Sequence, residues 1–248
     1  MAKLKSLIKI EGTLDDLTFY KGTDGYLVRT KGGVSGDRIK NDPAFKRTRE
    51  NGQEFADSAK AGKLLRRVLR PLLKDAQDSR VTSRLTQHMT RVKNADLTSE
   101  RGKRNVATGL LTVDGKTQLR GFDFNNRAPL ESVLLAEFTL NPTSGEVQIP
   151  SFIPAEDIAY PVSATHVSLR AAFVKVDFET RQHKAELSTL INLPIDLTVS
   201  NVVLTPAVPT GSGIQLYALY ISFYQEVNGV QYPLNNGVFN ALQLIEVV

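Results

Sequence analysis

The pattern of apolar and polar positions divides the chain into three parts. In the first part, residues 4–31, short apolar and aromatic stretches are bounded by Gly and Asp. Phe19, Tyr20 and Tyr26 lie on either side of a short loop that contains Asp24-Gly25. Such a loop is typical of a β-hairpin. Because a lone hairpin is only marginally stable in water, we expect this part to pack on another surface or to pair with another chain.

The second part begins with a glycine-rich joint. Gly32, Gly33 and Gly36 lack the spacing of a Walker or Rossmann phosphate loop, which favours a simple turn over a phosphate site. Asn41-Asp42-Pro43 then supplies a capping side chain and a proline at the first helical position. A helix is therefore predicted to begin here.

Two helices are predicted in this second part. Pro71 should kink or restart the first helix, because proline cannot donate a backbone hydrogen bond. Asp78 or Ser79 should cap the second, and small residues such as Gly52 and Gly62 permit close approach of the two. We expect an antiparallel helical hairpin. The apolar positions on which it depends are Phe45, Phe55, Ala59, Leu65, Val68, Leu69 and Leu72 in the first helix, and Val81, Leu85, Met89 and Val92 in the second.

From about Val106 the hydrophobic period changes to two, which indicates strands. Turn residues recur between them, including Asn228-Gly229 and Asn235-Asn236-Gly237. Many strands at this spacing favour an antiparallel β-sandwich, Ig-like or jelly-roll-like. Strands are predicted near residues 107–113, 118–124, 132–140, 145–150, 165–178, 184–193, 196–204, 214–227, 230–233 and 238–247.

The predicted fold class is therefore α+β. We divide the chain into a β-hairpin segment at residues 1–36, a basic helical region at 37–106 and a β-sandwich domain at 107–248. The 41% of hydrophobic residues and 23% of charged residues are close to a globular average, so a sizeable core is expected. The absence of cysteine excludes disulfides, thiolate metal sites and cysteine nucleophiles.

No apolar stretch approaches the roughly 18 residues of a spanning helix, so no membrane span is expected. Lys3, Lys5 and Lys9 interrupt the apolar residues of the N-terminus, and no signal peptide is expected either. We expect a protein of the cytoplasm, or one within a phage-like or other particle.

Charge is divided sharply between the two halves of the chain. Residues 1–106 hold 24 Lys and Arg against 13 Asp and Glu, a net charge of +11. Residues 107–248 hold 7 against 13, a net charge of −6. This asymmetry predicts either different partners for the two halves or an attraction between them.

No pattern of catalytic, metal or cofactor residues stands out. His88, His166 and His183 are isolated from one another, without the spacing of a zinc motif. The carboxylate pairs Asp15-Asp16 and Glu156-Asp157 resemble solvated turns more than a catalytic pair. We predict no catalytic residue, no metal site and no cofactor, and hence a protein that is not an enzyme.

Basic side chains of the helical region are the best candidates for interaction. They can lie on a solvated surface with ion pairs to Glu50, Glu54, Asp57, Asp75 and Asp78, contact another protein, or contact nucleic-acid phosphates. Phe45 and Phe55 are expected in the core, so base stacking is not predicted. The candidates are Arg47, Arg49, Lys63, Arg66, Arg67, Arg70, Arg80, Arg84 and Arg91, together with the hairpin aromatics Phe19, Tyr20 and Tyr26.

The run KGGVSGDRIKNDPAFKRTRENGQEF, with RVTSRLTQ and SERGKRNV after it, resembles an uncharacterised bacterial protein family. The resemblance covers roughly the first 110 residues and implies no activity.

These patterns predict a structural protein that associates with copies of itself through contacts between its basic part and its acidic β-region. Head-to-tail contacts of this kind give a ring-like particle, a tube or a filament, with a phage-related particle as one setting. The alternative is a nucleic-acid-binding protein that uses the same cations on phosphate, and a third class is a β-sandwich ligand-binding module. A steep salt dependence and copurifying nucleic acid would distinguish the alternative.

Overall fold

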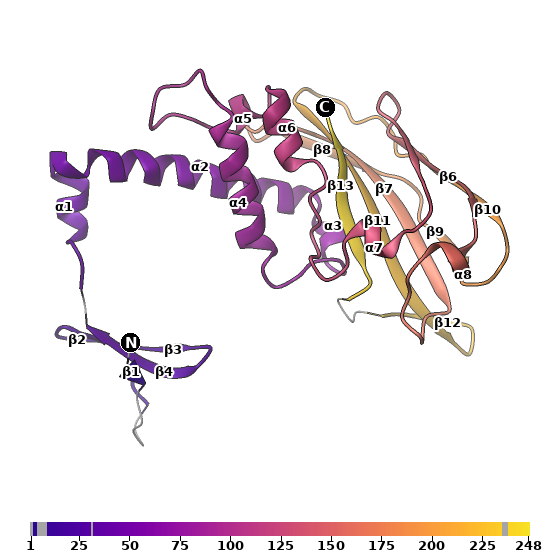
Figure 1. The fold of residues 1–248 in the computed structure, drawn as a ribbon, viewed down its shortest axis with the longest axis horizontal. Coiled ribbons are helices and arrows are strands. Elements are labelled where there is room, and N and C mark those ends of the chain that lie inside the picture. The colour runs from indigo at the N-terminus through magenta and orange to yellow at the C-terminus, as the bar shows by residue number, and fades with distance from the viewer. Residues whose placement is uncertain (1, 4–8, 31, 235–237) are drawn as a thin grey trace. The chain divides into compact units, whose positions relative to one another are not determined.

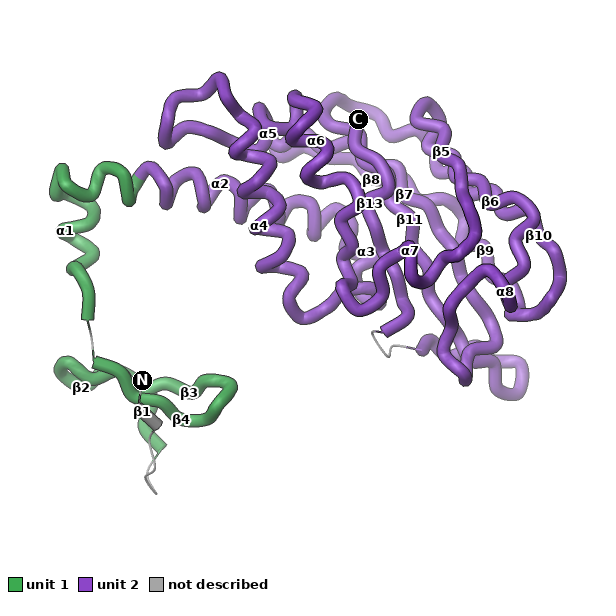
Figure 2. Tube along the Cα trace, viewed as in Figure 1, with its two compact units in different colours: residues 1–49 green, residues 50–248 purple. Residues whose placement is uncertain are grey.

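The computed structural model describes residues 2–3, 9–30, 32–234 and 238–248. It divides the chain into two compact units, unit 1 at Met1–Arg49 and unit 2 at Glu50–Val248 (Figure 2). Both contain helices and antiparallel sheets, which confirms the α+β fold class. Residues 4–8, Lys31 and the predicted turn at Asn235-Asn236-Gly237 lie outside the described residues.

Unit 1 holds a four-stranded antiparallel sheet of order β1-β4-β3-β2. The predicted hairpin is confirmed as β3 and β4, in which Phe19 pairs with Val28 and Gly22 with Gly25 across the turn. Gly25 has φ of +100°, a conformation that favours glycine. The strands are β1 (Ala2–Lys3), β2 (Gly12–Leu14), β3 (Leu17–Gly22) and β4 (Gly25–Thr30).

A short helical segment leads from the sheet to the long helix α2 (Lys46–Val68). It consists of α1 (Gly36–Asn41) and the 3-10 turn η1 (Pro43–Phe45). The predicted helix start at Asp42-Pro43 is confirmed, because the Asp42 side chain accepts a hydrogen bond from the Ala44 amide at 2.9 Å. Helix α2 begins in unit 1 and continues into unit 2.

Unit 2 contains two antiparallel sheets. In the larger, β12-β11-β7-β8 form a row, β13 also pairs with β11, and β9 also pairs with β7. The smaller has the order β10-β6-β5. The larger sheet comprises β7 (His166–Val176), β8 (His183–Leu187), β9 (Ile191–Pro194), β11 (Ile214–Val227), β12 (Val230–Pro233) and β13 (Ala241–Val247). The smaller comprises β5 (Thr139–Asn141), β6 (Glu146–Phe152) and β10 (Ser200–Leu204).

The larger sheet is the middle layer of three. Along β11, Leu216, Ala218 and Tyr220 face a core shared with the helices, whereas Tyr217 and Leu219 face a core shared with β6 and β10. Figure 1 shows the unit 2 helices that precede residue 120 on one side of this sheet and β6 and β10 on the other. Because both faces are covered, the central strands are apolar at nearly every position rather than at every second one.

Most helices of unit 2 form the first layer, which packs on the core that contains Leu65, Leu85 and Leu119. Helix α7 instead contributes Leu130 and Val133 to the core shared with β6 and β10. Helix α2 crosses α4 at Gly62, where a Cβ would lie 3.5 Å from Leu85 and 3.8 Å from Met89. The predicted stripe of α4 is buried, which confirms the helical pair. The helices are α3 (Arg70–Leu73), α4 (Val81–Asn94), α5 (Val106–Gly109), α6 (Val113–Leu119), α7 (Leu130–Val133) and α8 (Pro154–Asp157).

Three predicted strands are wrong. Residues 107–113 lie mainly in α5 and the turn between α5 and α6, and 118–124 form the end of α6 and the loop after it, in which Asp123 makes an isolated β-bridge to Gln243. Most of 132–140 forms the end of α7 and a loop before β5. Side-chain caps start α5 and α6: Asn105 accepts from the Thr108 amide and Thr112 from the Gly115 amide. These caps outweigh a local pattern of period two.

The remaining strands agree with the sequence pattern. The strand predicted near 184–193 is two strands, β8 and β9, which both pair with β7. The predicted turn at Asn228-Gly229 is confirmed, with positive φ at both residues. The prediction that Phe55 is in the core is wrong, because 59% of its surface is exposed.

Candidate functional site

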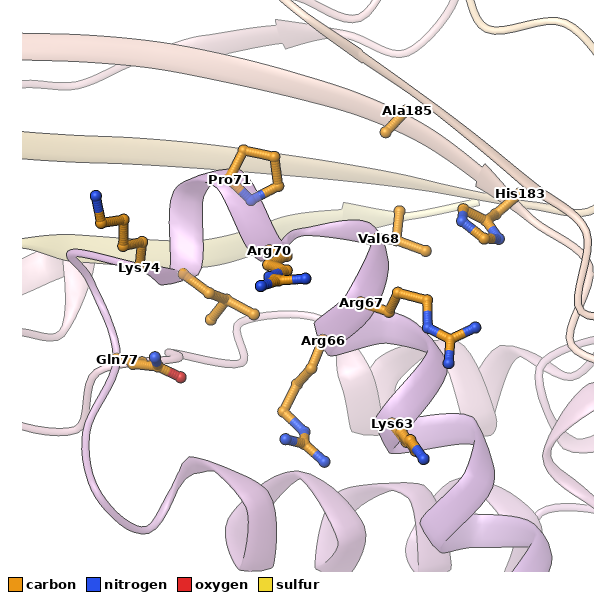
Figure 3. A pocket seen from close by; sticks show the side chains of 11 residues that line it. Lys63, Arg66, Arg67, Val68, Arg70, Pro71, Lys74, Gln77, His183 and Ala185 are labelled. Carbon is orange, nitrogen blue, oxygen red and sulfur yellow. The ribbon is translucent and has the colours of Figure 1, made fainter.

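A basic cleft lies where the end of α2 and the following helix α3 meet strand β8. Its volume is about 1080 Å³. Figure 3 shows the side chains from the helical segment and from β8 around it. The lining residues are Lys63, Arg66, Arg67, Val68, Arg70, Pro71, Leu73, Lys74, Gln77, His183 and Ala185.

Helical spacing explains why the cations gather here. Lys63, Arg67, Arg70 and Lys74 follow one another at four, three and four residues, so they share one side of the helical segment. All four are exposed, whereas the intervening apolar residues, such as Leu65, are buried against α4. Burial of the apolar side thus orients the basic side toward the cleft.

The cleft carries a concentrated positive charge. Five of its lining residues are Lys or Arg and none is Asp or Glu. Of the five carboxylates expected to neutralise them, three are paired with other cations: Glu50 with Arg101, Glu54 with Lys93 and Asp78 with Arg84. Within the described part of the chain, none of the five cations has a carboxylate within 4.0 Å.

Arg66 has an unused donor in the cleft. Its Nε atom is buried and has no hydrogen-bond partner among the described residues. A guanidinium donates from five N–H groups in a planar fork that fits carboxylate or phosphate oxygens. The side chain is thus available to an oxygen-rich anion that the chain itself does not supply.

A second cluster of charges is buried behind α2 and is structural. Glu54, which is 3% exposed, accepts hydrogen bonds from Lys93 Nζ at 2.6 Å, the Gly102 amide at 2.7 Å and Arg104 Nε at 3.2 Å. Burial acts to raise the pKa of Glu54, but these donors outweigh it and lower the pKa to about 2. The cluster fastens the loop before α5 to α2 and α4.

Asp96 stabilises the same loop, which connects α4 to α5, through hydrogen bonds to its backbone. Its carboxylate accepts from the amides of Thr98, Ser99 and Asn105 at 3.0 to 3.1 Å. Burial acts to raise the pKa of Asp96, but hydrogen bonds from Ser99, Asn105 and Thr98 lower it to about 2. Both carboxylates are therefore ionised throughout the range in which the chain is expected to be folded.

Acid is expected to unfold the chain by protonating these two carboxylates. The pKa of each is lowered on folding, from 4.5 for Glu54 and 3.8 for Asp96. Their stabilisation is complete above the unfolded values and is lost as pH falls from about 4.5 to about 2. Urea denaturation at a series of pH values should show the free energy of unfolding falling through this window. The double variant Glu54→Gln/Asp96→Asn should show a shallower dependence, and an unchanged slope would contradict the assignment.

The sheet of unit 1 presents two exposed faces. Strand pairing places Phe19, Tyr26 and Val28 on one face, with Leu14 and Leu17 alongside; we call this the apolar face. Tyr20 lies on the opposite face with Leu27 and Arg29, so the three predicted aromatics do not form one patch.

Unit 1 shows no buried core in the part of it that the structure describes. None of the described residues from 9 to 49 is buried. On the apolar face, Leu14 is 63% exposed and Leu17 is 41% exposed. Lys9 and Lys21 lie over the Tyr26 ring, with Nζ 5.4 and 5.9 Å from its centroid, and give this face a basic rim.

A hollow on unit 2 is acidic and apolar, and so complements the apolar face of unit 1 with its two lysines. It has a volume of about 470 Å³, and its only charged lining residues are Glu131 and Glu137. Its apolar lining includes Leu135, which is 62% exposed. We call it the acidic hollow; its lining residues are Leu130, Glu131, Leu134, Leu135, Ala136, Glu137, Phe138 and Gln243.

Of the predicted interaction residues, the structure brings Lys63, Arg66, Arg67 and Arg70 together in the basic cleft. Two others are structural. Arg49 donates to the carbonyls of Ile39 and Asp42 at 2.7 and 2.9 Å. Arg84 pairs with Asp78, donates to the carbonyl of Asp123 at 2.8 Å and lies over the Phe122 ring. The exposed residues Arg47, Arg80 and Arg91 lie outside the cleft.

Sequence reasoning missed three features of these sites. Lys74 continues the spacing of Lys63, Arg67 and Arg70 and was detectable by extending the helical pattern past Pro71. His183 reaches the cleft only because β8 lies against the helices. The acidic hollow depends on the loop after α7, where a strand was predicted.

Comparisons with known proteins give no information on these sites. No protein-family model matches this chain, and searches against curated proteins and solved structures found no match. The resemblance to an uncharacterised bacterial family therefore stays a prediction. Among the described residues, no three His, Asp or Glu side chains form a group that could hold a metal ion. None of the described helices has the length and hydrophobicity needed to cross a membrane.

Proposed function

We propose that this protein is a structural, non-enzymatic protein that associates with copies of itself, with unit 1 of one copy docking on unit 2 of the next. The observation that carries the proposal is the absence of any buried side chain among the described residues 9–49. A four-stranded sheet with uncovered apolar side chains is stabilised when another surface covers it. The partner proposed here is a second copy of this chain.

Charge complementarity favours a second copy. Residues 1–49 contain 11 Lys and Arg against 6 Asp and Glu, whereas residues 107–248 carry a net charge of −6. On the apolar face, the basic rim of Lys9 and Lys21 surrounds an apolar centre. The acidic hollow combines Glu131 and Glu137 with the exposed Leu135.

The acidic hollow is preferred over a second acidic depression near Asp177 and Glu179. There, the Asp177 carboxylate already accepts from the Glu179 and Thr180 amides at 2.9 and 3.1 Å. In the acidic hollow, neither Glu131 nor Glu137 has an ion pair within the described part of the chain. Both carboxylates are therefore available to the lysines of a partner.

The proposed contact joins two different surfaces, so it is heterologous. Heterologous contacts close into rings or continue as filaments, according to the rotation between copies. A ring-like particle, a tube or a filament is the expected product. The apolar centre should supply most of the affinity, while the charged rim sets the orientation of the partner and its sensitivity to salt.

Introducing two aspartates on the apolar face should abolish association. The test variant is Leu14→Asp/Leu17→Asp, and the matched control is Thr13→Asp/Thr18→Asp, which puts the same charge on the opposite face of the same strands. Light scattering behind size-exclusion chromatography should give a multiple of 27.3 kDa for the wild type and the control, and 27.3 kDa for the test variant.

A charge exchange tests the partner surface. Lys21→Glu should weaken association by placing a carboxylate opposite Glu137, and Glu137→Lys in the same chain should restore it. A wild-type species of 27.3 kDa would overturn the proposal, as would equal association of the two double-aspartate variants. A monomer in which unit 1 resists proteolysis would instead point to docking within one chain.

A further inference from the structure

The basic cleft is not used by the proposed self-association, and its chemistry points to a different partner. We infer that the cleft binds the sugar-phosphate backbone of a nucleic-acid strand, without reading the bases. The binding residues are Lys63, Arg66, Arg67, Arg70 and Lys74.

The density of positive charge identifies the class of ligand. Lys63 in α2 and Lys74 at the C-cap of α3 are eleven residues apart, and the three arginines of the cleft lie between them. A partner must present negative charges at a similar density. Nucleic acids do so, with one phosphate per roughly 3.4 Å of each duplex strand.

The acidic hollow and the acidic depression near Asp177 do not offer such a density. Each is lined by only two carboxylates, Glu131 and Glu137 in the acidic hollow and Asp177 and Glu179 in the other. An isolated carboxylate would neutralise one cation and leave the others unpaired. A chain of phosphates is therefore a better match for the cleft than a segment of a second copy.

The side-chain chemistry fits phosphate. Three of the five cations are arginines, whose planar forks bind phosphate oxygens in pairs. The Nε atom of Arg66, which has no partner within the described residues, is one donor that a phosphate oxygen can satisfy. Because this atom is buried, a phosphate oxygen reaches it only when the guanidinium turns toward the cleft.

The floor of the cleft explains the lack of base recognition. It is apolar, with Val68, Pro71 and Ala185 available to pack against sugar rings. No Phe, Tyr or Trp lines the cleft, so bases have no stacking platform. Binding through phosphate contacts alone gives little sequence preference and a strong salt dependence.

The test is fluorescence anisotropy of a fluorescein-labelled oligo(dT) of about 20 nucleotides, titrated with the full chain. If about four to five phosphates are neutralised, affinity should fall roughly 50- to 130-fold between 50 and 200 mM salt. Oligo(dA) of the same length should bind within about threefold. Inorganic polyphosphate should compete at matched phosphate concentration.

Two triple variants locate the site. Arg66→Glu/Arg67→Glu/Arg70→Glu should weaken binding at least 100-fold, and the neutral Arg66→Gln/Arg67→Gln/Arg70→Gln at least tenfold. The matched control Arg80→Glu/Arg91→Glu/Arg127→Glu changes net charge equally at exposed arginines outside the cleft and should stay within about threefold. Circular dichroism melting should show that each variant is folded.

Several outcomes would overturn the inference. One is the absence of wild-type binding to oligo(dT) at 50 mM salt, and another is equal weakening by the cleft and control variants, which would indicate diffuse attraction to net charge. Binding of polyphosphate, measured by isothermal titration calorimetry, in the absence of oligo(dT) binding would exclude nucleic acid as the source of the phosphates. Light scattering in the same buffers keeps this test separate from self-association, because the cleft variants leave the apolar face of unit 1 unchanged.

Discussion

Replacing Glu54 by Gln is expected to lower the free energy of unfolding by about 3 to 5 kcal/mol. The substitution preserves size but removes the charge that Lys93 Nζ contacts at 2.6 Å. Because the Lys93 side chain is only 8% exposed, its ammonium group would remain buried without a counterion. Urea denaturation followed by circular dichroism at pH 7 measures the loss.

The control for this substitution is Glu50→Gln, one helical turn earlier. Glu50 pairs with Arg101, whose side chain is 58% exposed, so water can replace the interaction. The expected loss there is about 1 kcal/mol or less. The double variant Glu54→Gln/Lys93→Met should recover part of the lost free energy of unfolding, because it also removes the buried Lys93 ammonium group that has no counterion. Equal losses for the two single variants would contradict the assigned role of Glu54.

Replacing Gly109 by Ala is expected to destabilise the chain by about 3 kcal/mol, because a side chain cannot be accommodated there. A Cβ at Gly109 would lie 2.2 Å from the Val92 carbonyl oxygen and 2.9 Å from its carbon. The obstacle is the backbone of α4, so relief requires that α4 and α5 move apart. The shift of the urea midpoint at unchanged slope measures this cost.

Gly52→Ala is the matched control, because it makes the same change within α2. A Cβ at Gly52 would meet no atom within 4 Å. Alanine is the better helix former by roughly 1 kcal/mol, so this variant should be more stable than the wild type. If both substitutions shifted the midpoint in the same direction, the close approach of α4 and α5 would not be important for stability.

Two sequence segments on either side of α4 have a structural role in this fold. Glu50 and Glu54, from the run that contains RENGQEF, pair with Arg101 and Arg104 from SERGKRNV. Gly102 between them has φ of +90° and donates its amide to Glu54. Two segments about fifty residues apart in the sequence thus form one contact.

Local physical chemistry was enough to predict several elements from the sequence. The hairpin of β3 and β4, the Asp42-Pro43 helix start and the Asn228-Gly229 turn each depend on neighbouring residues and are as expected. The buried stripe of α4 followed from its periodicity. The α+β class and the concentration of positive charge in the helical region were accessible in the same way.

Tertiary structure decided the rest, because it depends on pairings between distant residues. The sequence by itself determined that β11 is apolar, but only the layers on both sides explain why Tyr217 and Tyr220 are both buried. Likewise, the sequence identified the cations, but not that Arg84 pairs with Asp78 whereas Arg66 has no ion pair among the described residues. A carboxylate can neutralise only a cation that the fold brings close to it. The distance between the two groups depends on the tertiary structure and cannot be derived from the composition.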